Sequence, residues 1–284
     1  MEAAFFDLDK TVIAKASMAA FGRPFYNEGL ISRRHVVRAV WGQLVFMHLG
    51  ASEQKLARIR ESVLRLTRGW DQERVRQVVR ETLESVVEPI IYAEAAELIA
   101  EHKAAGRRVF IVSASPLEIV EPLAEYLGVH RAIASVAAID DEGRYTGEME
   151  SYAYGPYKAD AMRELAAAEG IDLAASYAYS DSYTDAPMLE TVGHPVAVNP
   201  DRVLRKLAEE RGWEVRTFSR PVRMRDDGAG SRVGRRAGIA GGVVVGLAAA
   251  GVGWLLIRRA ASSPPPRRVR PGSRGGSASS WRGR

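Results

Sequence analysis

The chain has 284 residues and contains no cysteine, which excludes disulfide bonds and thiolate chemistry. Its formal net charge of +5 is unevenly spread, because residues 1–219 hold 26 basic and 33 acidic residues whereas residues 220–284 hold 14 arginines and 2 aspartates. The excess positive charge therefore lies in a C-terminal tail, and the mildly acidic remainder argues against nucleic-acid binding by the folded part.

The apolar run at residues 3–6 predicts a short buried strand, and Asp7-Leu8-Asp9 follows it directly. Aspartate favours turns over strands, so Asp7 and Asp9 should stand where the strand ends. In open α/β sheets, ligands bind at that end of the strands. Two carboxylates so close repel each other unless a cation or a shared proton intervenes. A solvated turn and a helix N-cap are the structural alternatives.

Residues 17–88 are predicted to be mainly helical, because apolar residues recur there at helical spacing. Gly69-Trp70-Asp71 interrupts the pattern, and Asp71 is a candidate N-cap for the helix that follows. The segment is too long for a loop. We therefore interpret it as a helical insertion over the end of the first strand.

A helix is expected over residues 93–105, closed by Gly106, and a second buried strand over residues 108–112. That strand leads through Ser113 into a further helix, and backbone N–H groups at the start of a helix suit an anion. An ordinary N-cap role for Ser113 or Ser115 is the alternative.

The rest of the folded part alternates strands with helices. Strands are expected at residues 133–139, 144–149, 176–180, 195–198 and 214–218, and helices at residues 156–169, 186–189 and 202–211. Lys158 lies at the positive start of a helix, where it indicates either an anion partner or a plain surface position. Asp181 and Asp185 follow a strand, as Asp7 and Asp9 do.

The C-terminal region has the features of a membrane anchor. Residues 237–257 carry no charge over 21 positions, and a helix of that length spans about 30 Å, the thickness of a bilayer core. Arginines flank the run on both sides, and a buried helix is the alternative. We expect a linker at residues 221–236, a single transmembrane helix at 237–257 that contacts membrane lipid, and a basic disordered tail at 258–284.

Two further expectations concern this anchor. Small residues recur at every fourth position of the span, a pattern that would allow a homodimer through the transmembrane helix. Charged residues interrupt the N-terminus too early for a signal peptide, so the protein is expected in the cell membrane, with the folded part that precedes the anchor in the cytoplasm.

The alternation of strands and helices predicts an α/β fold with a parallel, Rossmann-like sheet and helices on both faces. In such a sheet the polar residues that follow the strands should meet at one edge: Asp7, Asp9, Ser113, Lys158, Asp181 and Asp185. Several carboxylates together with a substrate phosphate suit Mg²⁺. A lysine and a helix N-terminus suit the phosphate oxygens.

In their order and spacing these residues resemble the motifs of the haloacid dehalogenase superfamily: Asp7-Leu8-Asp9-Lys10-Thr11-Val12, Ser113, Lys158 and Asp181-x-x-x-Asp185. The resemblance covers about residues 3–220. The helical insertion is similar to the C1-type cap of the phosphoserine phosphatase-like subfamily (IB), including actinobacterial members with a C-terminal hydrophobic segment. A haloacid dehalogenase fold is implied, with a core at residues 1–14 and 89–220 and a cap at 15–88.

The resemblance also implies a mechanism, that of a Mg²⁺-dependent phosphomonoester hydrolase with an aspartyl-phosphate intermediate. Asp7 would be the nucleophile, and Asp9 would be the general acid and then the general base. Mg²⁺ would be held by Asp7, Asp181 and the backbone carbonyl of Asp9. The phosphate group of the substrate would be held by Ser113, Ala114 and Lys158. Asp185 and Thr11 would have supporting positions beside these ligands.

The substrate, a small phosphorylated molecule, stays open. Phosphoserine phosphatases use a glutamate for the substrate amino group at a position where this chain has Ala16. A phosphatase of a lipid or lipid-precursor phosphate at the membrane is one alternative, and a non-catalytic, membrane-tethered phosphate-binding module is another of a different class. A phosphotransferase or a dehalogenase on the same scaffold is a third, although dehalogenases need neither Asp9 nor the metal.

Overall fold

A computed structural model of the protein describes residues 1–32 and 53–220, with side chains from residue 60 onward in the second of these ranges. In the described part no helix is long and apolar enough to cross a membrane. The expected linker, transmembrane helix and tail at residues 221–284 lie outside it. The membrane location, the lipid contact and the homodimer therefore stay predictions.

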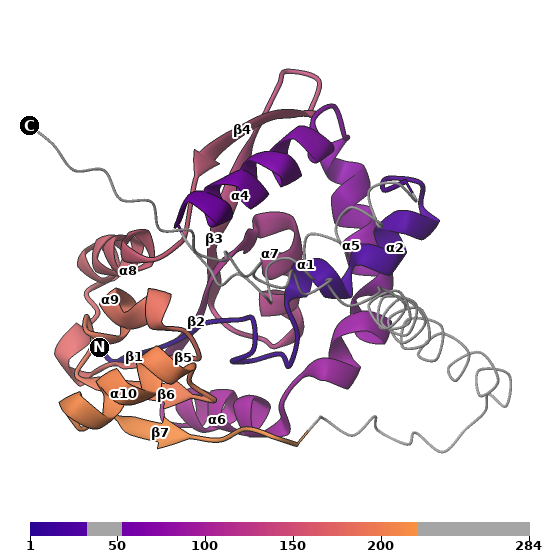
Figure 1. Ribbon diagram of the computed structural model, residues 1–284. Helices are drawn as coiled ribbons and strands as arrows, with labels where there is room; N and C mark the ends of the chain where they lie inside the picture. Colours follow the sequence, from indigo (N-terminus) through magenta and orange to yellow (C-terminus); the bar gives the residue numbers. More distant parts are fainter. Residues whose placement is uncertain (33–52, 221–284) are drawn as a thin grey trace, which may run out of the picture. The chain divides into compact units, whose positions relative to one another are not determined.

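A seven-stranded sheet in the order β4-β3-β2-β1-β5-β6-β7 organises the described residues (Figure 1). Adjacent strands are parallel except β3 and β4, which form an antiparallel hairpin at one edge. The strands are β1 (Ala3–Phe6), β2 (Arg108–Pro116), β3 (Arg131–Ile139), β4 (Tyr145–Ser151), β5 (Tyr177–Ser180), β6 (His194–Val198) and β7 (Glu214–Arg216). The predicted α/β fold with a mostly parallel sheet is confirmed.

Helices lie between the strands as the apolar spacing predicts. They are α1 (Ser17–Ala20), α2 (Gly22–Asn27), α4 (Glu53–Thr67), α5 (Gln72–Val87), α6 (Ala93–Ala104), α7 (Leu117–Tyr126), α8 (Pro156–Glu169), α9 (Ala186–Leu189) and α10 (Arg202–Arg211). The predicted cap of α5 is confirmed, because the Asp71 side chain accepts a hydrogen bond of 2.7 Å from the backbone N–H of Arg74.

Strand β1 is central, and its four residues have no exposed surface. Because side chains alternate along a strand, Ala4 and Phe6 pack into one hydrophobic core with α5, α6 and α7, whereas Ala3 and Phe5 pack into a second core with α8, α9 and α10. Burial on both faces fixes the strand firmly. Its C-terminal end, where Asp7 begins, is therefore held in a rigid frame.

The helices between β1 and α6 are tied to the β3–β4 hairpin. Backbone N–H groups of Gly69 and Gln72 donate to the carbonyls of Tyr145 and Gly143, at 2.8 and 3.0 Å, and Tyr145 donates back to Trp70 at 3.0 Å. Helix α5 also packs against α7. The helical insertion thus lies over the sheet edge formed by β3 and β4, while its predicted boundaries stay a prediction.

One strand is longer than expected. The sequence predicts a strand only to residue 112, but β2 stays extended through Ser113 to Pro116. Its pairing with β3 shifts after Val112 and resumes between Pro116 and Ser135, whose hydroxyl donates to the carbonyl of Ala114 at 2.8 Å. The N-cap of α7 is Pro116, without a side-chain hydrogen bond. Neither serine of this stretch is an N-cap.

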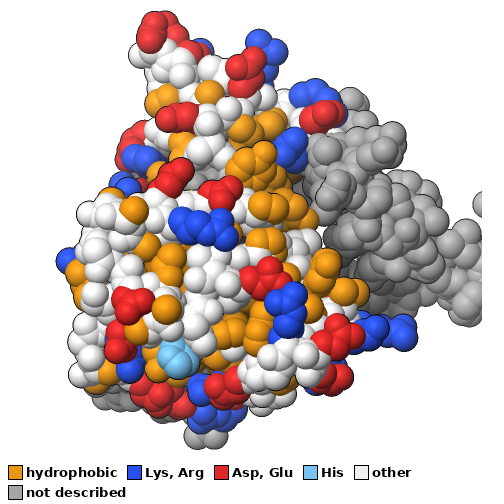
Figure 2. Space-filling view, turned by 90° about the vertical axis from the view of Figure 1, so that its left-hand side faces the viewer, with side chains coloured by type: hydrophobic (Ala, Val, Ile, Leu, Met, Phe, Trp, Pro, Cys, Tyr) orange, Lys and Arg blue, Asp and Glu red, His pale blue; other side chains and the backbone are white. Residues whose placement is uncertain are grey.

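The exposed side of the second core is mixed in charge. Figure 2 shows acidic and basic side chains interspersed with hydrophobic ones over this face. The electrostatic potentials of neighbouring positive and negative side chains largely offset each other a short distance from the surface. This face therefore lacks the potential of a single sign that attracts nucleic acid.

His102 in α6 lets the fold be tested by acid. It is buried, and its Nε2 atom lies 2.8 Å from the hydroxyl of Tyr179. Burial, and then the positive charges of Arg107 and Arg216, lower the pKa of His102 from 6.5 to about 4. The unfolded chain therefore binds a proton between these values that the folded protein does not. The contribution of His102 to the free energy of unfolding is therefore fully present above about pH 6.5 and is lost as the pH falls towards 4.

We expect this difference to lower the free energy of unfolding by up to about 3 kcal/mol between neutral pH and pH 4. A His102→Gln variant should lose less stability over the same range, and urea unfolding at a series of pH values measures it. His194→Gln is the matched control, because His194 is exposed. An acid dependence in His102→Gln as steep as in the native protein would contradict the assignment.

Candidate active site

Asp7 and Asp9 stand where β1 ends. The backbone N–H of Asp7 donates to the carbonyl of Tyr179 at 2.9 Å, which fastens Asp7 to the neighbouring strand β5. The chain then turns sharply, and the N–H groups of Val12 and Ile13 both donate to the carbonyl of Leu8, at 2.9 and 3.1 Å. This turn leaves the side chain of Asp7 almost fully buried at the carboxyl edge of the sheet.

Lys158 bridges two carboxylates. Its Nζ atom donates to Asp7 Oδ1 at 2.6 Å and to Asp185 Oδ2 at 2.8 Å, and its own side chain is only 3% exposed. Gly155, with φ of 58°, turns the chain into α8 so that Lys158 enters the site from the first turn of that helix. Burial alone would lower the pKa of Lys158, but the two carboxylates outweigh it and raise that pKa. Lys158 is therefore not a surface lysine.

The end of β5 supplies the second acid pair. Asp185 Oδ2 also accepts a hydrogen bond of 2.7 Å from the hydroxyl of Ser180, the last residue of the strand. Burial raises the pKa of Asp181 to about 6, with Lys10 opposing and Asp185 adding to the shift. Asp181 also contributes to the electrostatic field at Asp7. The acidic turns after β1 and β5 thus meet, as their positions in a parallel sheet predict.

Asp9 has a separate environment built by two serines. Its Oδ1 atom accepts from the backbone N–H of Ser17 at 2.8 Å, and its Oδ2 atom accepts from the hydroxyl of Ser115 at 3.2 Å. The hydroxyls of Ser17 and Ser115 are 2.7 Å apart. Sequence reasoning did not assign these serines, or Ser180, to the site. Their only signal is that short hydroxylic residues surround the strand ends.

The remaining predicted residues lie nearby with different contacts. Ser113 is buried in β2, and its hydroxyl accepts from the backbone N–H of Ser115 at 3.1 Å. Ala114 accepts from Ser135 through its carbonyl, at 2.8 Å. Thr11 is fully buried, and its hydroxyl has no hydrogen-bond partner among the described residues.

The balance of charged side chains in the site favours the binding of a metal ion. Burial raises the pKa of Asp7 well above its usual range; the carboxylates of Asp185 and Asp181 add to this and Lys158 opposes it. The buried carboxylates thus outnumber the lysine, and a divalent cation with oxygen ligands would relieve their repulsion. Within residues 1–32 and 53–220 no three His, Cys, Asp or Glu side chains form a ready-made cluster. The donor types fit Mg²⁺, with Asp7 and Asp181 as side-chain candidates.

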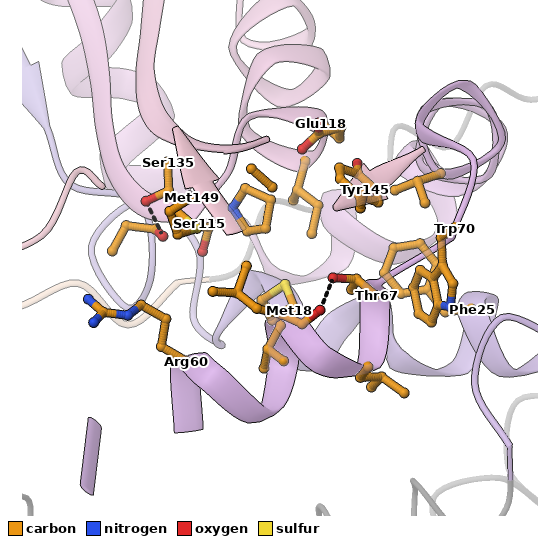
Figure 3. Close-up of a pocket in the computed structure, with 18 of the residues that line it drawn as sticks. Met18, Phe25, Arg60, Thr67, Trp70, Ser115, Glu118, Ser135, Tyr145 and Met149 are labelled. Atoms are coloured by element: carbon orange, nitrogen blue, oxygen red, sulfur yellow. Dashed lines mark hydrogen bonds between the residues drawn. The ribbon is translucent and has the colours of Figure 1, made fainter. Parts of the chain in front are cut away.

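A cavity of about 320 Å³ is lined in part by Ser115 (Figure 3), the residue whose hydroxyl donates to Asp9. Ala114, Ser115 and Pro116 lie in its wall, so it opens from the stretch whose hydroxyl contacts Asp9. Most of the other lining side chains are apolar and come from the helical insertion and from β3 and β4. The site therefore has two parts, a charged edge at Lys158 and an apolar cavity beside Ser115.

Residues 4–190 match the family of haloacid dehalogenase-like hydrolases. The chain is 52% identical to an inhibition of morphological differentiation protein of Streptomyces azureus, over 92% of this chain and 95% of the relative. It is 50% identical to a probable phosphatase of Mycobacterium tuberculosis, over 92% and 91% of the two chains. A phosphoserine phosphatase of the same organism is 37% identical, over 76% and 70%.

Solved structures agree on the fold. A protein of unknown function from Bordetella pertussis Tohama I superposes with a TM-score of 0.66 at 28% identity, covering 76% of this chain and 97% of its own. A phosphoserine phosphatase carrying a phospho-aspartyl intermediate analogue superposes with a TM-score of 0.53 at 21% identity, covering 78% and 95%. At that identity the second likeness concerns the fold alone.

Proposed function

The chain belongs to the haloacid dehalogenase-like hydrolase family, and from this premise we propose that it is a Mg²⁺-dependent phosphomonoester phosphatase that works through a phosphoaspartate at Asp7. One observation carries the proposal: a buried carboxylate at a strand end is held by Lys158, while a second carboxylate, Asp9, is held separately by two serines. Relatives named as phosphatases support the reaction class.

The reaction divides between the two aspartates. A carboxylate oxygen of Asp7 attacks phosphorus, and the bond between phosphorus and the ester oxygen breaks. Asp9 gives its proton to the leaving alkoxide, and then takes a proton from the water that attacks the phosphoaspartate. Inorganic phosphate leaves and the Asp7 carboxylate is restored. The hydrogen bonds from Ser17 and Ser115 orient Asp9 for both transfers.

Charge has to be neutralised for an anion to attack a phosphate. Lys158 is placed to do part of this, because its ammonium group already lies 2.6 Å from the attacking carboxylate. Mg²⁺, when bound by Asp7, Asp181 and the Asp9 carbonyl, would supply the rest of the positive charge. Ser113 and the backbone at Ala114 would hold the remaining phosphate oxygens.

The alternatives differ in what they ask of the site. A non-catalytic phosphate-binding module has no use for several buried carboxylates that raise one another's pKa. A phosphoserine phosphatase would need a partner for the substrate amino group, and Ala16, which directly precedes α1, offers no carboxylate. Hydrolysis of a membrane lipid phosphate would also use the residues at 237–257, which lie outside the described part.

We expect the purified full-length protein to release inorganic phosphate from phosphomonoesters in the presence of Mg²⁺. EDTA should stop the release and added Mg²⁺ should restore it, because the carboxylate excess needs a divalent ion. The panel should contain phosphoserine, a lysophosphatidate and a simple alkyl phosphate. Absence of Mg²⁺-dependent release from every ester would favour the non-catalytic module.

A further inference from the structure

The walls of the cavity beside Ser115 are mainly hydrophobic. They come from α1 and α2, the end of α4, the start of α7, and the β3–β4 hairpin. The apolar lining includes Met18, Phe25, Val63, Trp70, Ile119 and Met149. A volume of about 320 Å³ falls within the range of small-molecule sites. Such a cavity favours an aliphatic or aromatic group over a small zwitterion.

Two residues connect this cavity to the reacting groups. Ser115 lies in the wall and hydrogen-bonds Asp9, the proposed proton donor to the leaving oxygen. Tyr152 also lies in the wall, where its ring stacks under the guanidinium of Arg60 at 4.7 Å. Burial raises the pKa of Tyr152; the charge of Arg60 and a hydrogen bond with it, and more weakly the charge of Lys158, oppose this rise. The part of a substrate beyond the ester oxygen would therefore enter the cavity.

Glu118 is the exception in this wall. It is 1% exposed; its Oε1 atom accepts a hydrogen bond of 2.8 Å from the side chain of Gln72, which links α7 to α5. Its Oε2 atom is buried and has no hydrogen bond of good geometry from the described residues. The hydroxyl of Tyr145 lies beside this carboxylate, and burial and then the charge of Glu118 raise the pKa of that hydroxyl. Figure 3 shows Glu118 beside Tyr145, apart from Ser115. Leaving a buried carboxylate oxygen unpaired is costly, so a donor on a bound ligand would be favoured there.

We propose that this cavity binds the alcohol part of the substrate, and that the preferred substrates are phosphate monoesters of an alcohol with an apolar body and a hydroxyl or ammonium group that reaches Glu118. This inference rests on the proposed phosphatase function. It accounts for features that phosphoserine does not use. A compact amino acid would leave most of the apolar wall uncovered, and its carboxylate would enter a cavity that already contains a buried carboxylate.

The test compares alkyl phosphates that differ only beyond the reacting end. Ethyl, butyl and hexyl phosphate have leaving groups of similar basicity, so kcat/KM reports binding in the cavity. We expect kcat/KM to rise by about threefold to fourfold for each added methylene until the cavity is filled. A terminal hydroxyl or amino group on the hexyl chain should raise kcat/KM further, by about tenfold, although it would normally oppose entry into an apolar site. The two analogues separate a hydroxyl from an ammonium donor.

A substitution then assigns the terminal group to its partner. In Glu118→Leu the ratio of kcat/KM between the hydroxyl- or amino-terminated and the plain hexyl phosphate should fall to one or below. Glu125→Leu is the matched control, because Glu125 lies in the same helix with its side chain exposed. The control should keep the native ratio.

The possible outcomes separate this inference from the function on which it rests. If the native protein hydrolyses ethyl phosphate and phosphoserine but gains nothing from a longer or donor-bearing chain, the inference is overturned and the phosphatase function stands. If the ratio is unchanged in Glu118→Leu, Glu118 is not the partner and the inference fails in the same way. If no ester is hydrolysed with Mg²⁺, both fail together.

Discussion

Replacing Asp7 by asparagine is expected to lower kcat by about 10⁴-fold or more, leaving no measurable turnover. An amide is a poor nucleophile and cannot form the phosphoaspartate, while its shape and its carbonyl oxygen still allow the hydrogen bond from Lys158. Steady-state phosphate release at saturating Mg²⁺ measures the loss. Acid quenching during turnover should trap phosphoenzyme with the native protein and none with Asp7→Asn.

The same substitution should leave the fold intact. Asp7→Asn removes one of the mutually repelling carboxylates, and Lys158 keeps its contact with Asp185, so the free energy of unfolding should not decrease. Asp141→Asn, in the exposed turn between β3 and β4, is the matched control and should have native activity. Turnover close to the native rate in Asp7→Asn would remove Asp7 from the nucleophile's role.

The charged edge of the site could be predicted because it depends on sheet geometry. The four apolar residues before Asp7 and the short apolar strand before Asp181 each place their acids at a carboxyl end, and parallel pairing of β1 with β5 brings these ends together. The start of α8 adds Lys158 to the same edge. Topology alone therefore gathers these residues, without any knowledge of side-chain packing.

The surroundings of Asp9 could not be predicted in the same way. Ser17 and Ser115 are types that usually occur in turns and caps, and their contact depends on α1 meeting the extended end of β2, which the sequence predicts to be shorter. The apolar cavity is formed by side chains from several separate segments. In the sequence, Glu118 has the pattern of an ordinary acidic residue in the first turn of a helix. Its burial results from the packing of α5 against α7, which the sequence does not predict.

Replacing Lys158 by methionine is expected to reduce both rate and stability. Loss of one preorganised positive charge should raise the barrier by roughly 2–4 kcal/mol, which lowers kcat by about 10²-fold to 10³-fold. Breaking a buried pair should reduce the free energy of unfolding by roughly 3–5 kcal/mol, because Asp7 and Asp185 are left without their shared partner. Steady-state kinetics and urea unfolding measure the two effects. Lys206→Met, at an exposed lysine, is the control for both.

The two effects can be separated by a double variant. Adding Asp185→Asn to Lys158→Met removes one of the unpaired carboxylates, so stability should be partly regained. The rate should stay low, because no ammonium group remains beside Asp7 to counter the charge that develops on the transferred phosphoryl group. Inhibition by inorganic phosphate should weaken in both variants, since Lys158 would hold a phosphate oxygen. A double variant that regains rate together with stability would mean that Lys158 serves only to neutralise buried aspartates.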